Sequence, residues 1–284
     1  MNRKLLPWCI AGVLTMTAQV HAQEDKYIWL EEVEGAKPME WVKAQNAASA
    51  AEIKAFKGFD TLVANSLAIL NDKERIPYAT HIGDKLYNFW KDDTHVRGIY
   101  RRTTMEEYTK AQPKWETVLD VDALGKSESV NWVFKSIDCQ YPDNQRCFVS
   151  LSRGGADAVE VREFDLTTKD FVPAKDKPFF LKEAKSSLSW IDKDQAFVGT
   201  DFGDGQSMTD SGYPRVVKLW QRGTPLDQAK TIFSGDKTSV AVSGWVMFDD
   251  KTPLSLVTEA HTFYTATQYV YQDGKLIKLP IPQD

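Results

Sequence analysis

The hydrophobic pattern divides the chain into two parts. Between Pro38 and Leu70, apolar residues recur near helical spacing among Lys, Glu and Ala, which predicts two helices. Gly58 and Asp60 separate them, and Asp60 is expected to be the N-cap of the second helix. From Ile76 onward, short runs of β-branched and aromatic residues alternate with Gly, Asp, Asn and Pro, with no long helical period. That pattern predicts an all-β region.

The predicted strands recur along this region. A first series returns about every 50 to 60 residues, and each member is followed by a second strand and then by a third. The first series covers 86–90, 148–151, 196–199 and 254–257, the second 98–101, 159–164, 216–220 and 269–271, and the third 115–121, 171–172, 231–233 and 276–279. This repeat length is typical of the blades of a β-propeller, and four blades fit.

We therefore predict a mainly β fold, a partial β-propeller of about four blades preceded by a short α-helical N-terminal segment. The expected division is a signal peptide at 1–22, a helical N-terminal segment at 23–75 and an incomplete propeller at 76–284. Neighbouring blades must stack face to face, because one blade cannot bury its own faces. An arc that does not close would leave a sheet face uncovered.

The N-terminus has the order of charge, apolar core and small-residue exit that is typical of a secretory signal peptide. Arg3 and Lys4 precede an apolar run at 5–20, which is too short for a membrane span and is closed by Ala22. The alternative is a buried core helix. We expect a mature protein that begins at Gln23 and is periplasmic or secreted.

The charge of the mature chain disfavours nucleic acid as a partner. Loss of Arg3 and Lys4 leaves 33 of the 35 basic residues against 40 acidic ones, a formal charge of about −7. No later apolar stretch approaches the roughly 18 residues of a spanning helix, so no membrane association is expected after signal removal.

Cysteine and histidine spacing limits the expected metal and redox chemistry. Cys139 and Cys147 flank strong turn residues, so they form either a disulfide across a hairpin or two small buried side chains. His81, His95 and His261 lack second ligands at the spacings that zinc requires. We expect no metal and no cofactor.

Several motifs resemble catalytic ones without their context. SRGGAD at 152–157 lacks the ending of a phosphate loop, and DFGDG at 201–205 lacks the remaining ligands of a calcium loop. No Gly-x-Ser-x-Gly elbow is present, and we expect Ser211 and Ser243 to lie in turns. His261 therefore has no activated nucleophile to serve. The sequence predicts no catalytic, cofactor-binding or metal-binding residues.

Eight stretches together resemble the prolyl oligopeptidase family of serine peptidases. They are YIWLEEVEG (27–35), WVKAQN (41–46), YNFWKD (87–92), RGIYRRT (97–103), WETVLD (115–120), LSRGGAD (151–157), REFD (162–165) and SGYPR (211–215). The resemblance covers nearly the whole mature chain.

The resemblance implies a two-domain enzyme: a β-propeller lid and an α/β-hydrolase domain whose Ser, Asp and His triad cleaves short peptides after proline or, in relatives, after basic residues. Residues 25–70 resemble the segment that packs on the hydrolase domain, and 76–284 resemble the first four or so of seven blades. The triad belongs to the hydrolase part, so none of its residues can be assigned here.

Three hypotheses follow. The first is the substrate-gating propeller portion of a secreted prolyl oligopeptidase-like endopeptidase, inactive alone. The second is one half of a two-chain peptidase, in which Tyr27, Trp29, Leu30 and Trp41 dock on a separate α/β-hydrolase chain. The third is a propeller that binds ligands without catalysis.

Two further groups of side chains have structural interpretations. Arg97, Arg101 and Arg102 are expected to be solvated or paired with nearby acids rather than to act as carboxylate clamps for a peptide end. Six tryptophans are expected to form the propeller core between blades rather than a substrate-stacking surface: Trp90, Trp115, Trp132, Trp190, Trp220 and Trp245.

Overall fold

The structure is a computed structural model that describes residues 25–32, 34–72, 74–248 and 252–283. It divides into two compact units, Met1–Ala68 and Ile69–Asp284. The expected signal peptide at 1–22 lies outside the described residues.

The first unit is helical. A 3₁₀ turn, η1 (Ile28–Glu31), precedes α1 (Ala36–Ala55) and α2 (Phe59–Leu70). Trp29 packs edge-on against Trp41, with ring centroids 6.1 Å apart. The prediction of Asp60 as an N-cap is wrong: α2 begins one residue earlier, and the Asp60 carboxylate lies in its first turn, where the helix dipole favours a negative charge.

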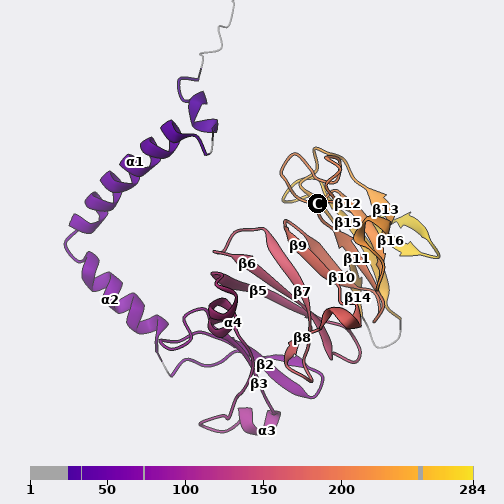
Figure 1. The fold of residues 1–284 in the computed structure, drawn as a ribbon, viewed down its shortest axis with the longest axis horizontal. Coiled ribbons are helices and arrows are strands. Elements are labelled where there is room, and N and C mark those ends of the chain that lie inside the picture. Colours follow the sequence, from indigo (N-terminus) through magenta and orange to yellow (C-terminus); the bar gives the residue numbers. More distant parts are fainter. Residues whose placement is uncertain (1–24, 33, 73, 249–251, 284) are drawn as a thin grey trace, which may run out of the picture. The chain divides into compact units, whose positions relative to one another are not determined.

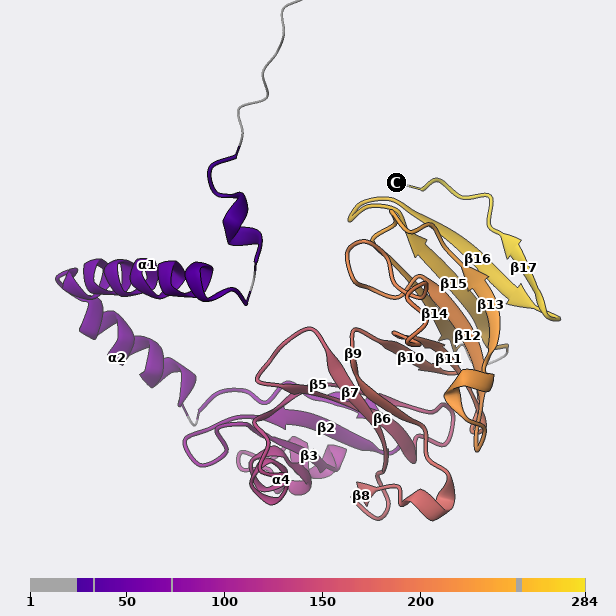
Figure 2. The ribbon, with the colours of Figure 1, turned by 45° about the horizontal axis from the view of Figure 1, so that its top comes forward.

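The second unit contains four antiparallel sheets in which strands adjacent in sequence are adjacent in space. The sheets follow one another along the chain (Figures 1 and 2). Sheet 1 has β1 (Thr80–Ile82), β2 (Lys85–Trp90), β3 (Ile99–Thr103) and β4 (Glu116–Asp120). Sheet 2 has β5 (Trp132–Cys139), β6 (Arg146–Arg153), β7 (Val159–Asp165) and β8 (Asp170–Phe171), with β9 (Phe180–Ala184) also on β7.

Sheets 3 and 4 repeat the same meander. Sheet 3 has β10 (Ser187–Trp190), β11 (Gln195–Gly199), β12 (Val216–Gln221) and β13 (Lys230–Ser234). Sheet 4 has β14 (Ala241–Met247), β15 (Leu254–Ala260), β16 (Ala266–Gln272) and β17 (Lys275–Lys278). The predicted mainly β fold with about four blades is confirmed.

The all-β prediction missed two kinds of element. The three predicted series are the second, third and fourth strands of the sheets, and the first strands were not recognised. Helices also interrupt the β region, at α3 (Met105–Tyr108) and α4 (Val121–Glu128). The strand predicted at 115–121 ends at Asp120 because the Asp120 side chain accepts a hydrogen bond from the backbone N–H of Ala123 and caps α4.

The core lies in the layers between consecutive sheets. In β6, Val149 belongs to the cluster shared with sheet 1, whereas its neighbour Phe148 stacks on Trp190 of sheet 3, with ring centroids 3.7 Å apart. Successive side chains of a strand point to opposite faces, so both faces of sheet 2 are buried. That explains the continuous apolar run at 147–149, which a sheet with one wet face would not have.

The layer between sheets 3 and 4 depends on a glycine. Gly244 lies within β14, and a β-carbon added there would come within 2.8 Å of the Phe197 side chain on β11. Ser243 and Gly244 therefore form part of a strand, and the expected turn at Ser243 is wrong. The absence of a side chain lets the two sheets approach closely.

The outer face of sheet 4 is a row of apolar side chains. Trp245 lies opposite Leu256, which lies opposite Val270, which in turn lies opposite Ile277. Exposure rises toward the edges of this face: Leu256 is 4% exposed, whereas Ile277 and the neighbouring Met247 are about half exposed. No described residue of a further sheet covers this row, because sheet 4 is the last in the described order.

A buried ion pair joins sheets 2 and 3. Arg222, in the β12–β13 turn, donates to both carboxylate oxygens of Glu163 on β7, at 2.8 and 3.0 Å. The Glu163 side chain is 0% exposed and also accepts the backbone N–H of Phe179 at 2.9 Å. A fully buried carboxylate needs this compensation.

We expect Arg222→Met to lower the free energy of unfolding by about 3–5 kcal/mol, because the fully buried Glu163 carboxylate loses both hydrogen bonds from Arg222 and keeps only a longer contact with Arg146, whose Nη1 lies 3.7 Å from Glu163 Oε1. Urea denaturation measures the loss. The Arg222→Met/Glu163→Gln double variant should recover part of it, since the remaining side chains are then both neutral. A loss in Arg222→Met no larger than that of an exposed substitution would contradict the role of this pair.

A second, exposed network joins sheets 1 and 2. Arg102 donates to Glu116 at 2.7 Å and to the backbone carbonyl of Leu166 at 2.8 Å, and Lys169 reaches the other Glu116 oxygen at 2.8 Å. The hydrogen bond from Arg102, followed by that from Lys169, lowers the pKa of Glu116 to about 2.

Because the folded pKa of Glu116 lies below its ordinary value of 4.5, its contribution to stability is present above pH 4.5 and is lost as the pH falls toward 2. We expect the stability difference between the wild-type chain and Glu116→Gln to shrink across that window. Urea midpoints measured at successive pH values test this, and a difference independent of pH would contradict it.

Candidate functional site

The loops that carry the singled-out motifs lie at one end of the four sheets. Successive strands are antiparallel, so the connection between the second and third strands leaves each sheet at the same end as the connection to the next sheet. We call this the loop end; its second-to-third connections are 91–98, 154–158, 200–215 and 261–265.

Hydrogen bonds join the loop end across sheet boundaries. The hydroxyl of Tyr213 donates to Asp157 at 3.2 Å, which links the connections at 154–158 and 200–215. The hydroxyl of Thr209 donates to the backbone carbonyl of Val240 at 3.0 Å, next to sheet 4. These two contacts connect loops of sheets 2, 3 and 4 that are far apart in the sequence.

The individual motifs have structural roles there. Ser152 is fully buried and donates to the backbone carbonyl of Ala156 at 2.7 Å, which closes the turn that contains Gly154 and Gly155, both with positive φ. Asp201 accepts the backbone N–H of Gly203 at 2.8 Å. Among the described residues, no group of His, Cys, Asp and Glu side chains is arranged to hold a metal ion.

His261 has a serine and a carboxylate nearby, but not in a triad. Ser239 Oγ lies 3.4 Å from His261 Nδ1 and also lies 3.0 Å from Glu259 Oε1. The second ring nitrogen of His261 meets the hydroxyl of Thr267 at 2.9 Å, not a carboxylate. Ser239 is 3% exposed, so an incoming carbonyl carbon has no access to its Oγ. The group stabilises the base of a loop.

Two aromatic side chains project from the loop end. Phe263 and Tyr264 are each 89% exposed. Their turn is held by Thr262, whose hydroxyl accepts the backbone N–H groups of Tyr264 and Thr265 at 3.1 and 3.0 Å. The sequence analysis did not single these residues out, although two adjacent aromatic residues in a polar turn were a visible signal.

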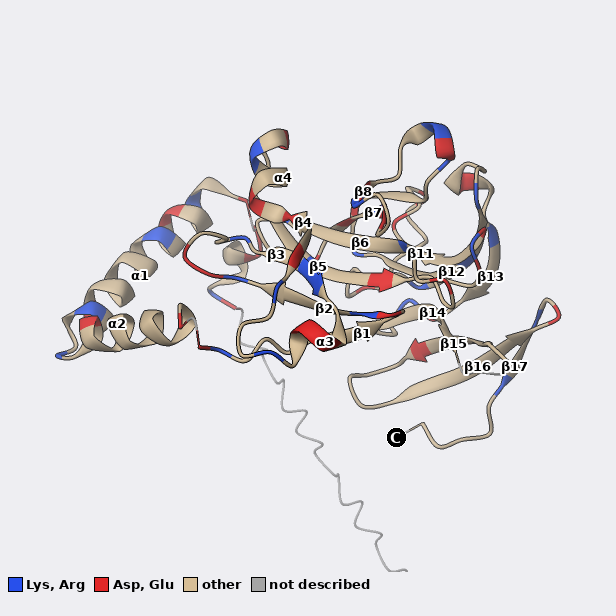
Figure 3. Ribbon diagram, turned by 90° about the horizontal axis from the view of Figure 1, so that it is seen from below, with Lys and Arg blue, Asp and Glu red and all other residues tan. Residues whose placement is uncertain are grey.

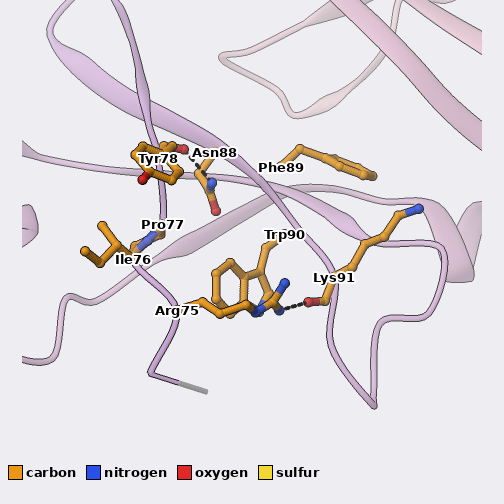
Figure 4. A pocket seen from close by; sticks show the side chains of 8 residues that line it. All are labelled: Arg75, Ile76, Pro77, Tyr78, Asn88, Phe89, Trp90 and Lys91. Carbon is orange, nitrogen blue, oxygen red and sulfur yellow. Dashed lines mark hydrogen bonds between the residues drawn. The ribbon is translucent and has the colours of Figure 1, made fainter. Parts of the chain in front are cut away.

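A pocket of about 640 Å³ lies beside sheet 1, at the same end (Figure 4). The Arg75 guanidinium lies over the Trp90 ring, 4.4 Å from its centroid, and donates to the backbone carbonyl of Lys91. Asn88 donates to the backbone carbonyl of Tyr78 at 2.6 Å. Cross-strand alternation places Asn88 and Trp90 on the face of sheet 1 that points away from sheet 2.

Asp92 follows the lining residue Lys91 and holds the ring of Trp90. It accepts the Trp90 indole N–H at 3.0 Å. Burial opposes the effect, but hydrogen bonds from His95 and Thr94 hold the pKa of Asp92 well below its ordinary value. Asp92 is therefore ionised, with its oxygens occupied by its own turn.

The tryptophans divide into two groups. Trp132, Trp190 and Trp220 are buried in the layers between sheets, as predicted. Trp90, Trp115 and Trp245 are half-buried and lie outside the three core clusters, so the core interpretation is wrong for them. The difference follows from which strand face each side chain occupies.

The three singled-out arginines also differ. Arg102 pairs with Glu116, as expected. For Arg101 no ion pair is found among the described residues: its guanidinium lies over two indole rings and its Nε donates to an amide. Basic and acidic residues are interspersed over the sheets (Figure 3).

Comparison with known proteins identifies the family. The model of the prolyl oligopeptidase N-terminal β-propeller domain matches residues 14–275. The chain belongs to the prolyl oligopeptidase family. The resemblance stated from the sequence is thus confirmed.

Two curated relatives are peptidases of uncharacterised specificity. The uncharacterized peptidase y4nA of Sinorhizobium fredii is 37% identical over 265 residues, 91% of this chain and 36% of the relative. The uncharacterized peptidase RP174 of Rickettsia prowazekii is 27% identical over 97% of this chain and 41% of the relative. The chain spans about two fifths or less of the length of these curated relatives.

Solved structures agree on the fold. A post-proline cleaving enzyme from Rickettsia typhi superposes with a TM-score of 0.80 at 29% identity, over 90% of this chain and 38% of that enzyme. Oligopeptidase B from Leishmania major superposes with a TM-score of 0.65 at 14% identity, which shows a shared fold alone. In the part of the chain that the structure describes, no helix is long and apolar enough to cross a membrane.

Proposed function

We propose that this chain is the N-terminal, substrate-gating propeller portion of a secreted prolyl oligopeptidase-like serine endopeptidase that hydrolyses short peptides after proline. The match to the propeller part of the post-proline cleaving enzyme, at a TM-score of 0.80 over 90% of the chain, carries the proposal. The proposal for proline rests on that enzyme's stated specificity.

The described residues support inactivity of the chain alone. A serine peptidase needs an accessible nucleophile, a base that contacts it and an acid that orients the base. The serine nearest to a histidine, Ser239, is buried, and the far nitrogen of His261 meets Thr267 instead of an acid. We therefore propose that the nucleophile comes from an α/β-hydrolase partner, either on the same polypeptide or on a separate chain.

The disulfide supports the proposal of export. Cys139 and Cys147 are cross-strand partners of β5 and β6, and they are joined by a disulfide bond. Structural disulfides persist mainly in oxidising compartments such as the periplasm. That agrees with the secretory signal expected at 1–22.

The helical first unit presents apolar side chains that a hydrolase part could cover. In the first unit, Tyr27 and Trp41 are 48% and 40% exposed, and Phe56 is 64% exposed. Large apolar side chains presented by helices require a surface to bury against. A hydrolase part would meet that requirement equally well on the same polypeptide or as a separate chain.

We expect the purified chain to give no labelling with a fluorophosphonate probe and no hydrolysis of a chromogenic proline-containing peptide, because no described serine has triad geometry. A full-length prolyl oligopeptidase serves as the positive control. Labelling that disappears in Ser239→Ala would contradict the assignment of this group to a structural role. Labelling that persists in that variant would reveal a nucleophile elsewhere and overturn the proposed inactivity.

A further inference from the structure

The outer face of sheet 1 carries a guanidinium held between aromatic rings. The Arg101 guanidinium carbon lies 4.2 Å from the ring centroid of Trp90 and 4.4 Å from that of Trp115. Cation–π contacts of this kind fix a side chain that would otherwise sample many rotamers. The position of Arg101 is therefore set before any ligand arrives.

Hydrogen bonds fix its orientation as well. Arg101 Nε donates to Asn88 Oδ1 at 3.0 Å, and Asn88 lies directly opposite Arg101 on the neighbouring strand β2. The Asn88 amide is itself held by its bond to the Tyr78 carbonyl, and Asn88 is 7% exposed. The guanidinium plane is thus fixed through two successive hydrogen bonds.

The Arg101 guanidinium makes no direct ion pair in the described part of the chain, although the ionised Asp92 lies near enough to favour its charge. Its two terminal amino groups make no hydrogen bond or ion pair there, and the oxygens of nearby Asp92 are used by Trp90, Thr94 and His95. Burial lowers the pKa of Arg101 to about 10, opposed by Asp92 and assisted by Arg75, so the group stays charged at neutral pH.

The surroundings of Arg101 are those of a docking surface. Arg101 lines a cavity of about 570 Å³ together with Arg75, Lys110 and Glu74. Lys110 is paired with Glu106 and Glu107, so Arg101 and Arg75 supply the positive charge that is left. Next to it, Ile76 and Tyr78 are 69% and 86% exposed. Exposed apolar side chains around a fixed arginine between aromatic rings are typical of the energetic centre of a protein interface.

We propose that Arg101 is a preformed binding site for one carboxylate, supplied by an acidic side chain of a polypeptide segment that packs on the outer face of sheet 1. A planar guanidinium with two free amino groups matches the two oxygens of a carboxylate. Charge complementarity favours an acidic segment, and the apolar rim favours a polypeptide over a free anion. The proposal does not depend on peptidase activity.

The test uses N-acetyl-glutamate N-methylamide as the probe and the corresponding glutamine derivative as its neutral match. Each is titrated into the ¹⁵N-labelled chain while the Arg Nε and Trp indole resonances are followed. We expect a saturable shift of the Arg101 Nε resonance with the glutamate probe, with a dissociation constant on the order of millimolar. The glutamine probe should give a several-fold smaller shift. Equal shifts with both probes would overturn the proposal.

Variants assign the response to Arg101, read on the Trp indole resonances. Arg101→Lys keeps the charge but removes the paired amino groups of the guanidinium, and Arg101→Met removes both the charge and these amino groups. Each variant should therefore lose the saturable response. Arg97→Met is the matched control, because Arg97 lies in the same sheet-1 region and its side chain contacts neither indole ring. An unchanged response in both Arg101 variants, or an equal loss in Arg97→Met, would overturn the proposal. If Arg101→Met does not fold, the response of Arg101→Lys alone decides whether Arg101 binds the probe.

Discussion

A four-stranded meander with large apolar side chains on both faces has to cover both, and this requirement organises the second unit. Sheets 2 and 3 are each covered on two sides, because neighbouring residues such as Phe148 and Val149 belong to different clusters. Stacking buries the faces in sequence order, so the order of repeats along the chain becomes the order of layers in space. The outer faces of sheets 1 and 4 have no neighbouring sheet among those described, because these two sheets are the first and the last in the described order.

Polar contacts determine how the layers align. Dispersion and apolar burial are not directional, whereas the Glu163–Arg222 pair fits only one register of sheet 3 on sheet 2. At the loop end, two hydrogen bonds between neutral or exposed groups also help to align neighbouring sheets. They join Tyr213 to Asp157 and Thr209 to Val240. The motifs that resembled catalytic loops in sequence are thus turns whose polar groups connect sheets.

Much of the fold was predictable because strand repeats leave a periodic signal, and the family resemblance extended it. Two of the first strands have a weak signal, because β1 has only three residues and β10 is half serine. The other two, β5 and β14, were missed although they have eight and seven residues and contain β-branched and aromatic side chains. The environment of Arg101 was not predictable, because it depends on the pairing of Asn88 with Arg101 and on the face of sheet 1 that receives no neighbour. Register and layer order are tertiary properties.

The central claim is that the described sheets form a stack whose outer faces lack partners, as in one portion of a larger propeller. Sedimentation velocity of the purified chain over a range of concentrations, with binding of an apolar fluorescent dye measured in parallel, tests it most directly. The account predicts dye binding and self-association that rises with concentration. The reason is that apolar side chains on an outer face, such as the row from Trp245 to Ile277, lower their free energy when another surface covers them. A monodisperse monomer that binds no dye would contradict it and would favour a self-contained binding module.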